Sequence, residues 1–397
     1  MAMVEIDERI RGGLAARVAA CTVAVALAAG CGGGGSGKPS AQPVSKPPPA
    51  ASTQTVDPGS ATSTPNVPGG VVPVYPPGTK LPAYAGTELG TYISTMQSAD
   101  SHGLKVWAES DLVKQWLAGP DAFNVTIQKL AAEAKAVPNL AGFKIADELG
   151  QSANSTTTPQ QALEFLKAAR AALNANAPGK LIMIDLIGYD LGCLPDQPSS
   201  TGRQTCLGNN TAKDSRLSLE TIDAIVNSGY IDEMNVTTNM LSEDQYQKQF
   251  GVSQAAAQKS AFAEIARRGW AKKIFVNSRK ALSWPTSPAV TTPDQAAAMA
   301  PNFIDVPLAS GVQGVDIWSW SQKWTGSGPN AGSIVQLMSP GYTTNALWTA
   351  LVQRHKQGDT LYVHYTPTYK TPGGSVDQDM AAMATAFSAV FVAAGTK

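Results

Sequence analysis

Acidic side chains occur at or near the C-terminal ends of several short β-rich runs. Glu109, Glu148 and Asp185 each occupy such a place. Cleavage of a glycosidic bond needs two carboxyl groups, one protonated as an acid and one ionised as a nucleophile or base. A Glu near tryptophan and other acids can have its pKa raised for the acid role. Glu148 and Asp185 are therefore the candidate catalytic pair, and Glu109 is a third acid beside them.

Alternation along the runs predicts which other side chains accompany these acids. Successive residues of a strand point to opposite faces, and the apolar residues take one face of each run. The residues between them share the face of the acids. The candidates for substrate binding, with Glu109, are Trp107, Asn235, Thr237, Asn277, Arg279, Trp318 and Trp320. Acids and amides bind hydroxyl groups while aromatic faces stack on pyranose rings, so this set favours a carbohydrate.

Each candidate also has a structural interpretation. Glu148 is equally compatible with a salt bridge to Arg279, and Asp185 with an N-cap of the following helix. Tryptophans are commonly core residues, and buried amides commonly satisfy backbone groups. Two further acids lie lower in their strands, where ion pairs with lysines are expected: Glu233 and Asp316, with Lys105 or Lys144.

The positions of these residues depend on a repeated pattern of strand and helix. The β-rich runs are Val71–Tyr75, Leu104–Glu109, Gly142–Glu148, Lys180–Leu186, Ile231–Thr237, Lys273–Ser278, Gly314–Trp320 and Thr360–Thr366. Alternating strands and helices indicate a parallel sheet. Eight units over ~250–300 residues fit an α/β fold, the (β/α)8 TIM barrel, whose active sites lie at the C-terminal ends of the strands. The first and last strands are the least regular of the set.

A doubly wound open sheet is the alternative fold, but it usually carries a glycine-rich first turn, which this sequence lacks. Apolar stripes at helical spacing lie between the runs. They comprise Phe123, Ile127, Leu130, Ala134 and Val137 in one segment and Ala162, Leu166, Ala169 and Leu173 in the next. The segments Ser242–Gly269 and Asp294–Leu308 are also typical of helices.

The N-terminus has the features of an export signal. Arginines precede the apolar run Val18–Ala29, and Cys31 follows small residues, which resembles a bacterial lipobox. The run is too short for a membrane-spanning anchor. We expect residues 1–30 to be a lipoprotein signal peptide and Cys31 to carry lipid after cleavage. The Gly/Pro/Ser/Thr-rich residues 31–70 then form a disordered tether, and residues 71–397 form the barrel domain.

The remaining cysteines, Cys193 and Cys206, predict a disulfide that closes a local loop, because an exported chain meets an oxidising compartment. A metal site is the alternative. It is disfavoured because no His lies near either Cys, and His102, His355 and His364 lack ligand spacing. No metal or organic cofactor is therefore expected.

The charge balance limits the partners. The chain of 397 residues has 30 Lys and Arg against 30 Asp and Glu, for a net charge of zero. No basic surface argues for nucleic acid or for an anionic membrane surface. We expect an exported monomer, anchored to the cell membrane through Cys31 on the extracellular or periplasmic face, whose partner is a carbohydrate.

Three segments resemble strands of known glycoside hydrolases. Gly142–Glu148 is similar to the fourth strand of barrel glycoside hydrolases, which ends in the acid/base Glu. Asp232–Asn239 is similar to the sixth strand of chitinase-like family 18 enzymes, and Gly314–Trp320 to their last strand, whose Trp floors the sugar subsite. The resemblance implies a carbohydrate-active barrel with Glu148 as acid/base.

The same segments depart from these families at defined places. Family 18 enzymes carry two further Asp residues where this chain has Lys144 and Ala146. Cellulase-like enzymes place Asn before the Glu, where this chain has Asp147. They also carry a second Glu on the seventh strand, where this chain has Asn277 and Arg279.

Two functional classes follow from these patterns. The first is a cell-surface glycoside hydrolase that acts on a poly- or oligosaccharide by carboxylate acid/base catalysis. The second is a non-catalytic carbohydrate-binding lipoprotein on a degenerate hydrolase barrel, because fold does not fix function. The several acids in phase favour the first, and the missing companion acids favour the second. A scaffold lipoprotein without a ligand is a third possibility.

Overall fold

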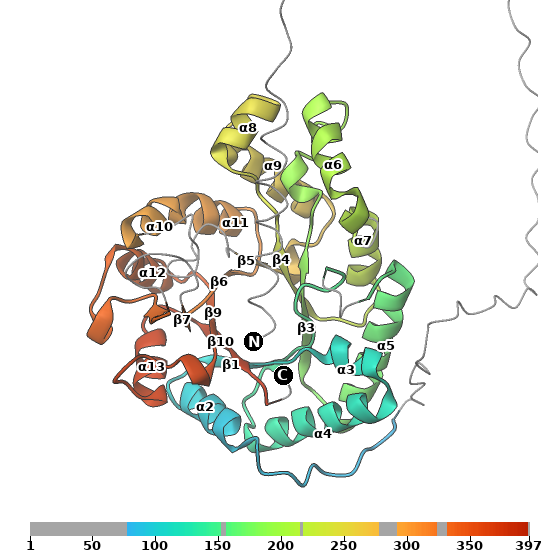
Figure 1. The fold of residues 1–397 in the computed structure, drawn as a ribbon, viewed down its shortest axis with the longest axis vertical. Coiled ribbons are helices and arrows are strands. Elements are labelled where there is room, and N and C mark those ends of the chain that lie inside the picture. Colours follow the sequence, from blue (N-terminus) through green and yellow to red (C-terminus); the bar gives the residue numbers. More distant parts are fainter. Residues whose placement is uncertain (1–77, 152–155, 215–216, 278–291, 324–331, 396–397) are drawn as a thin grey trace, which may run out of the picture. The chain divides into compact units, whose positions relative to one another are not determined.

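The centre of the protein is a closed ring of eight parallel strands. The computed structural model describes residues 78–151, 156–214, 217–277, 292–323 and 332–395. Around the ring the order is β1, β10, β9, β6, β5, β4, β3 and β2, and β2 pairs again with β1 (Figure 1). The strands are β1 Lys105–Glu109, β2 Gly142–Lys144, β3 Leu181–Ile187, β4 Glu233–Thr237, β5 Ile274–Asn277, β6 Gly314–Ile317, β9 Leu361–Tyr365 and β10 Ala389–Ala393.

Helices surround this ring. They are α2 Gly90–Ser101, α3 Leu112–Ala118, α4 Pro120–Ala136, α5 Pro159–Asn176, α6 Thr201–Asp214, α7 Leu219–Asn227, α8 Glu243–Phe250, α9 Gln254–Arg267, α10 Pro293–Ala300, α11 Val306–Ala309, α12 Ala346–Lys356 and α13 Val376–Met383. A hairpin of β7 (Ser321–Lys323) and β8 (Ile334–Gln336) follows β6. The predicted TIM barrel is therefore confirmed, and within the described residues α2 precedes the first strand.

The two ends of the predicted strand series need revision. The run Val71–Tyr75 lies outside the described residues, and the ring closes between β1 and β10. Ala389–Ala393 was not among the predicted strands, yet it is the eighth. Thr360–Thr366, the last predicted run, contains β9, the seventh strand of the ring. Counted from β1, the segment that ends in Glu148 belongs to the second strand.

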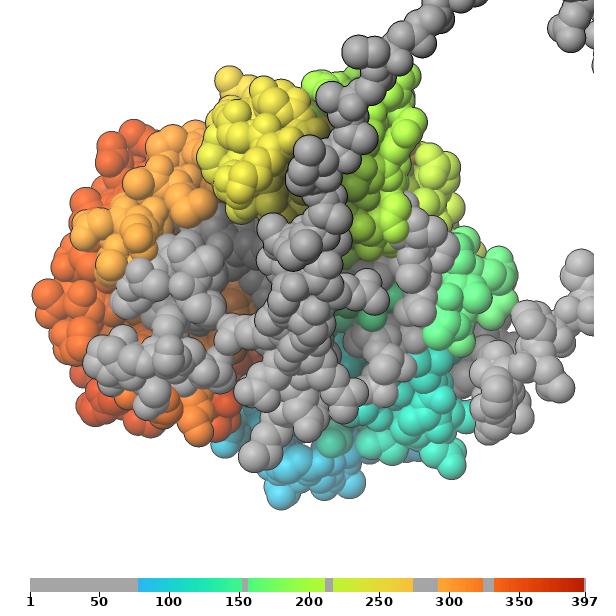
Figure 2. All heavy atoms as spheres, turned by 45° about the horizontal axis from the view of Figure 1, so that its top comes forward, coloured from blue at the N-terminus to red at the C-terminus, as the bar shows by residue number. Residues whose placement is uncertain are grey.

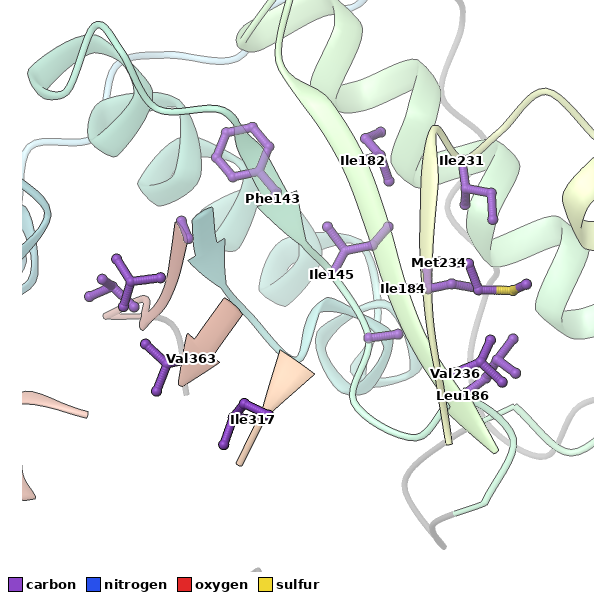
Figure 3. Packing of buried hydrophobic residues seen from close by; sticks show 14 of the residues in the cluster. Phe143, Ile145, Ile182, Ile184, Leu186, Ile231, Met234, Val236, Ile317 and Val363 are labelled. Carbon is purple, nitrogen blue, oxygen red and sulfur yellow. The ribbon is translucent and has the colours of Figure 1, made fainter. Parts of the chain in front are cut away.

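Apolar side chains on the outer faces of the strands form the main core. Figure 3 shows Ile182, Ile184 and Leu186 of β3 beside Met234 and Val236 of β4. All five are buried against the surrounding helices. Alternating faces of each strand thus separate an apolar layer outside the ring from a different set of residues inside it.

The two predicted apolar stripes form the buried faces of α4 and α5. Each helix has Pro at its first position, where the missing backbone N–H costs no hydrogen bond. The predicted helix Ser242–Gly269 is instead two helices, because Gly251 adopts a left-handed conformation with φ of 68° and ends α8. The segment predicted over Asp294–Leu308 is helical, with a π-helical turn at Pro301–Asp305 between α10 and α11.

The connection between β3 and β4 contains the predicted disulfide. Cys193 and Cys206 are bonded, with their Cα atoms 5.7 Å apart. The bond joins the short helix η1 (Leu191–Cys193) to α6. In Figures 1 and 2, α6 and α7 (green) lie beside α8 and α9 (yellow). The disulfide therefore fixes a long excursion of the chain beside the carboxyl end of β3.

The predicted signal peptide, Cys31 and the tether lie outside the described residues. Within the part of the chain that the structure describes, no helix is both long and apolar enough to cross a membrane.

A buried carboxyl group on α4 contacts the C-terminal end of the chain. Glu133 is fully buried, and its Oε1 accepts a hydrogen bond from the backbone N–H of Gly395, at 3.2 Å. Burial raises the pKa of Glu133 to about 7, although the Gly395 bond and the charge of Lys129 oppose the rise. The neutral form of Glu133 is therefore the one that the fold accommodates best.

We predict that Glu133→Gln stabilises the protein at pH 8. Between pH 4.5 and pH 7 the unfolded chain loses this proton before the folded chain does, so stability falls as pH rises through that window. The amide of the glutamine does not ionise, so its burial carries no such cost. The free energy of unfolding at pH 8 should therefore rise by up to ~3 kcal/mol. Thermal unfolding at pH 5 and pH 8 measures it, with the exposed Glu164→Gln as control. An equal gain at both pH values would contradict the prediction.

Candidate functional site

The lower part of the ring interior is closed by apolar side chains. Trp107, Met183, Tyr362, Ala389 and Phe391 form one cluster inside the barrel. A side chain at Gly142 would clash with the backbone of Leu181 on β3 and with the Trp107 ring, so glycine leaves room for both. Trp107 is fully buried, which corrects its prediction as a substrate-binding residue. It faces the interior as expected, but it fills the lumen instead of lining the mouth.

Beneath this cluster, at the first residues of β1 and β4, Lys105 approaches Glu233, with Nζ 3.9 Å from Oε1. The expected ion pair between these residues is confirmed. This ion pair lies at the amino ends of the strands. Residues at that end of a TIM barrel usually contribute to stability and not to catalysis.

A buried lysine occupies the interior near the carboxyl ends of the strands. Lys144 of β2 is fully buried, and its Nζ lies 3.1 Å from Oε1 of Glu109 and 3.2 Å from Oδ2 of Asp185. Asp147 is more distant, at 3.8 Å. Loss of hydration lowers the pKa of Lys144, but these carboxylates more than offset it, and the pKa is raised above its ordinary value. Lys144 is therefore a permanent cation between the acid of β1 and the acid of β3.

A second cation continues the network on the other side of Glu109. Nδ1 of His364 lies 3.1 Å from Oε2 of Glu109, and its Nε2 lies 2.7 Å from Oδ2 of Asp316. The Nδ2 group of Asn235 donates to the same Asp316 oxygen, at 2.7 Å. We call this set the lumen network: Glu109, Lys144, Asp185, Asn235, Asp316 and His364. Residues from six strands of the ring thus meet at one level.

The carboxyl group of Asp185 differs from the others in its titration. Burial raises its pKa to about 7 against the attraction of Lys144, and the charges of Asp147, Glu148 and Asp316 add to the rise. Its Oδ1 atom is buried and has no hydrogen-bond partner among the residues that the structure describes. An acid whose pKa lies near neutrality, with one oxygen uncommitted, is suited to hold and release a proton.

Glu148 lies above this network, in the loop that follows β2. Strand β2 ends at Lys144, so the predicted alternation does not extend to Glu148. Its side chain is half-buried, and its backbone has a left-handed φ of 49°. A non-glycine residue in that conformation is uncommon and is found most often at turns and functional sites. The negative charge of Glu148 contributes to the raised pKa of Asp185.

The two tryptophans after β6 have different environments. Trp318 is half-buried, its ring centroid lies 4.7 Å from that of His364, and its Nε1 donates to Gln322 at 3.0 Å. Trp320 is fully buried and packs against Trp348 of α12, 5.5 Å away. The prediction that Trp320 binds substrate is therefore wrong. Strand β6 ends at Ile317, and the alternation that would have turned Trp320 inward ends with it.

The remaining predicted residues are only partly described. Asn235 is inside the ring and fully buried, and Thr237 is half-buried at the end of β4. Asn277 is the last residue of β5, but its side chain is outside the described part, as is the whole of Arg279. No group of three or more His, Cys, Asp or Glu residues in the described ranges could hold a metal ion.

Three members of the network were not among the predicted site residues, namely Lys144, Asp316 and His364; Asp316 was expected only in an ion pair with a lysine. The alternation rule that selected Glu109 also applies to them. In β9 the apolar residues Leu361, Val363 and Tyr365 join the outer core, so His364 faces the interior. The sequence signal was therefore present in the phase of the strand, although His364 has no spacing typical of a metal ligand.

Comparisons with known proteins identify no family. The sequence matches no protein-family model and none of the curated proteins. Solved structures with a similar fold include a putative phosphonomutase from Burkholderia cenocepacia, at 11% identity and a TM-score of 0.36 over 78% of this chain and 93% of that one. GH5_18 from Streptomyces cattleya, in complex with Manb1-4GlcNAc, has 17% identity and a TM-score of 0.38 over 69% and 72%. β-Methylaspartase from Clostridium tetanomorphum has 14% identity and a TM-score of 0.38 over 75% and 57%.

The class of protein follows from the strand topology and the site. The chain is a TIM-barrel protein with a buried, charged centre near the carboxyl ends of its strands, the end at which such barrels place their chemistry.

We predict that Lys144→Met destabilises the fold by ~3–5 kcal/mol, because it leaves the buried carboxyl of Asp185 without its cation and Glu109 with His364 alone. Lys105→Met is the matched control. Lys105 is 44% exposed and lies 3.9 Å from its acid, so its loss should cost less than ~1 kcal/mol. Urea unfolding at pH 7 compares the two, and equal losses would contradict the central role of Lys144.

Proposed function

We propose that this protein binds a poly- or oligosaccharide at the carboxyl ends of the barrel strands and hydrolyses it. The observation that carries the proposal is that the loop of Glu148 is hydrogen-bonded to the backbone of Asp185. The backbone N–H of Leu149 donates to the carbonyl of Asp185 at 2.9 Å, and the N–H of Asp185 donates to the carbonyl of Ala146 at 3.0 Å. The loop that carries Glu148 is thereby fixed to the end of β3.

The two carboxyl groups have contrasting surroundings, which suits them to different roles. Glu148 is half-buried at the rim and is the acid/base that meets the glycosidic oxygen. Asp185 lies beneath it, with a side chain only 4% exposed and a pKa raised to about 7 by burial. In such a pair, the acid gives its proton to the leaving oxygen, and a water that loses a proton to the base adds to the anomeric carbon.

The placement of the resembling segments around the ring supports the proposal. They lie on β2, β4 and β6, whereas the families have them on the fourth, sixth and last strands. Each segment therefore lies two strands earlier in this chain than in the families. Because the barrel is a closed ring, the segments still have the same positions relative to one another. β5, which ends in Asn277, then takes the place of the seventh strand, where the families carry their second Glu. Asp185 on the neighbouring β3 is the carboxyl proposed in its stead.

A second candidate function is supported by one contact. Lys144 binds Asp185 at 3.2 Å, so that this carboxyl is already engaged inside the protein. A barrel that had lost catalysis would retain such an ion pair and the aromatic Trp318 as a binding surface. The alternative is therefore non-catalytic carbohydrate binding at the same rim.

Activity on a panel of polysaccharides and aryl glycosides tests the proposal. Glu148→Gln should lower kcat/KM by ~10²–10⁴-fold, the usual contribution of a general acid or base. Glu164→Gln, exposed on the following helix, is the control. Wild-type protein that binds a glycan but cleaves none would overturn hydrolysis and leave the binding function.

The pH profile is a separate test of Asp185. Because Glu148 is the proposed acid, Asp185 acts as the ionised base, and activity should rise as pH increases through about 7. Asp185→Asn should remove that limb of the profile. An unchanged limb in the variant would show that another group sets it.

We also propose that the protein is exported and held on the cell membrane by lipid on Cys31. The support is the sequence of residues 1–30, with its arginines, short apolar run and small residues before Cys31. The tether of residues 31–70 would let the barrel reach a surface glycan.

Expression with a palmitate analogue tests the anchor. Wild type should take up the label and sediment with membranes, and Cys31→Ser should do neither, because a second lipid attachment point is not expected. Cys21→Ser is the matched control and should behave as wild type. A labelled, membrane-bound Cys31→Ser variant would refute the assignment.

A further inference from the structure

The contacts of His364 define its role more closely than those of the other network residues. Both ring nitrogens face carboxylates, Nδ1 toward Glu109 at 3.1 Å and Nε2 toward Asp316 at 2.7 Å. A neutral imidazole carries only one N–H, and its other nitrogen has a lone pair that would oppose a carboxylate oxygen. Only the imidazolium donates to both.

We propose that His364 is a positioning residue, a permanently charged imidazolium that joins the two halves of the lumen network and orients its carboxylates. One half contains Glu109, Lys144 and Asp185, from β1, β2 and β3. The other contains Asn235 and Asp316, from β4 and β6. His364 links the two halves, so the orientation of Glu109 on one side is fixed relative to Asp316 on the other.

The surroundings of the ring are compatible with a buried cation. The charged groups that face it are Glu109, Asp316 and Lys144. Its ring also packs against the tilted rings of Trp318 and Phe391, with centroids 4.7 and 4.8 Å away. Burial lowers the pKa of His364 and Lys144 opposes the charge, but Asp316 and Glu109 outweigh both, and the pKa rises to about 9. An aromatic face next to a cation adds a further attraction.

This geometry gives His364 two connections to the proposed hydrolytic site. Through Glu109 and Lys144 it reaches Asp185, and by direct packing it supports Trp318 at the rim. The effect of His364 on catalysis rests on the proposed function, whereas its charge state does not. The two can therefore be tested separately.

The charge state is tested on the full chain labelled with ¹⁵N-histidine. The chain has three histidines, and the variants His102→Gln, His355→Gln and His364→Gln assign their signals. We expect both ring nitrogens of His364 to be protonated from pH 6 to pH 8. A single protonated nitrogen at pH 7 in the wild-type protein would overturn the proposal.

The attribution to the carboxylates is tested by Asp316→Asn. With one acid removed, the ring should lose its second proton at a lower pH than in wild type. An unchanged titration would show that Asp316 does not stabilise the charge of His364, and would overturn the proposed link between the two halves of the network.

The positioning role is tested by kinetics of His364→Gln on any substrate that wild type cleaves. Gln keeps one donor and should lower kcat by up to ~100-fold through misplaced groups, with a smaller change in KM and a shifted pH profile. Unchanged kcat and profile in a folded variant would overturn the role. Absence of wild-type hydrolysis would refute the proposed function alone, since the nitrogen spectra still decide the charge of His364.

Discussion

The buried ammonium of Lys144 is the interaction on which the centre of this barrel depends. An isolated charge in the interior costs several kcal/mol in lost hydration, and here it is tolerated because Glu109 and Asp185 both lie about 3 Å away. The same argument applies to His364 between Glu109 and Asp316. Two cations among three carboxylates make an arrangement in which each charge requires the others.

This requirement constrains the register of the strands. Glu109 pairs with Lys144 across β1 and β2, and Asp185 pairs with Asn235 across β3 and β4. A slip of one residue in any of these strands would exchange its inner and outer faces. A slip would then place a charge against the apolar helices and an apolar residue in the network. The lumen network therefore specifies the register of the barrel strands.

The layering inside the ring also explains why the site lies where it does. Trp107, Tyr362 and Phe391 fill the middle of the lumen, so no ligand can pass through the barrel. Among the described side chains, the polar groups inside the ring lie at its two ends. At one end a single lysine meets Glu233 at 3.9 Å. At the other, the network is overlain by the loop of Glu148 and by Trp318, and both are half-buried at the rim. Substrate is therefore expected at this second end.

The sequence by itself determined the class of fold, the two helical stripes, the disulfide and the inward face of most strands. Alternation and helical spacing are local patterns, and a strand buried on one side must display them. The eighth strand was not predicted because Ala389–Ala393 and its neighbours form a short apolar run, which periodicity cannot distinguish from a helix. Only the tertiary structure decided where each strand ends, and with it that Glu148 lies in a loop and Trp320 in the outer core. It alone also decided that Lys144 and His364 join the acids, because contacts among six strands depend on the closure of the ring, and no local pattern contains that information.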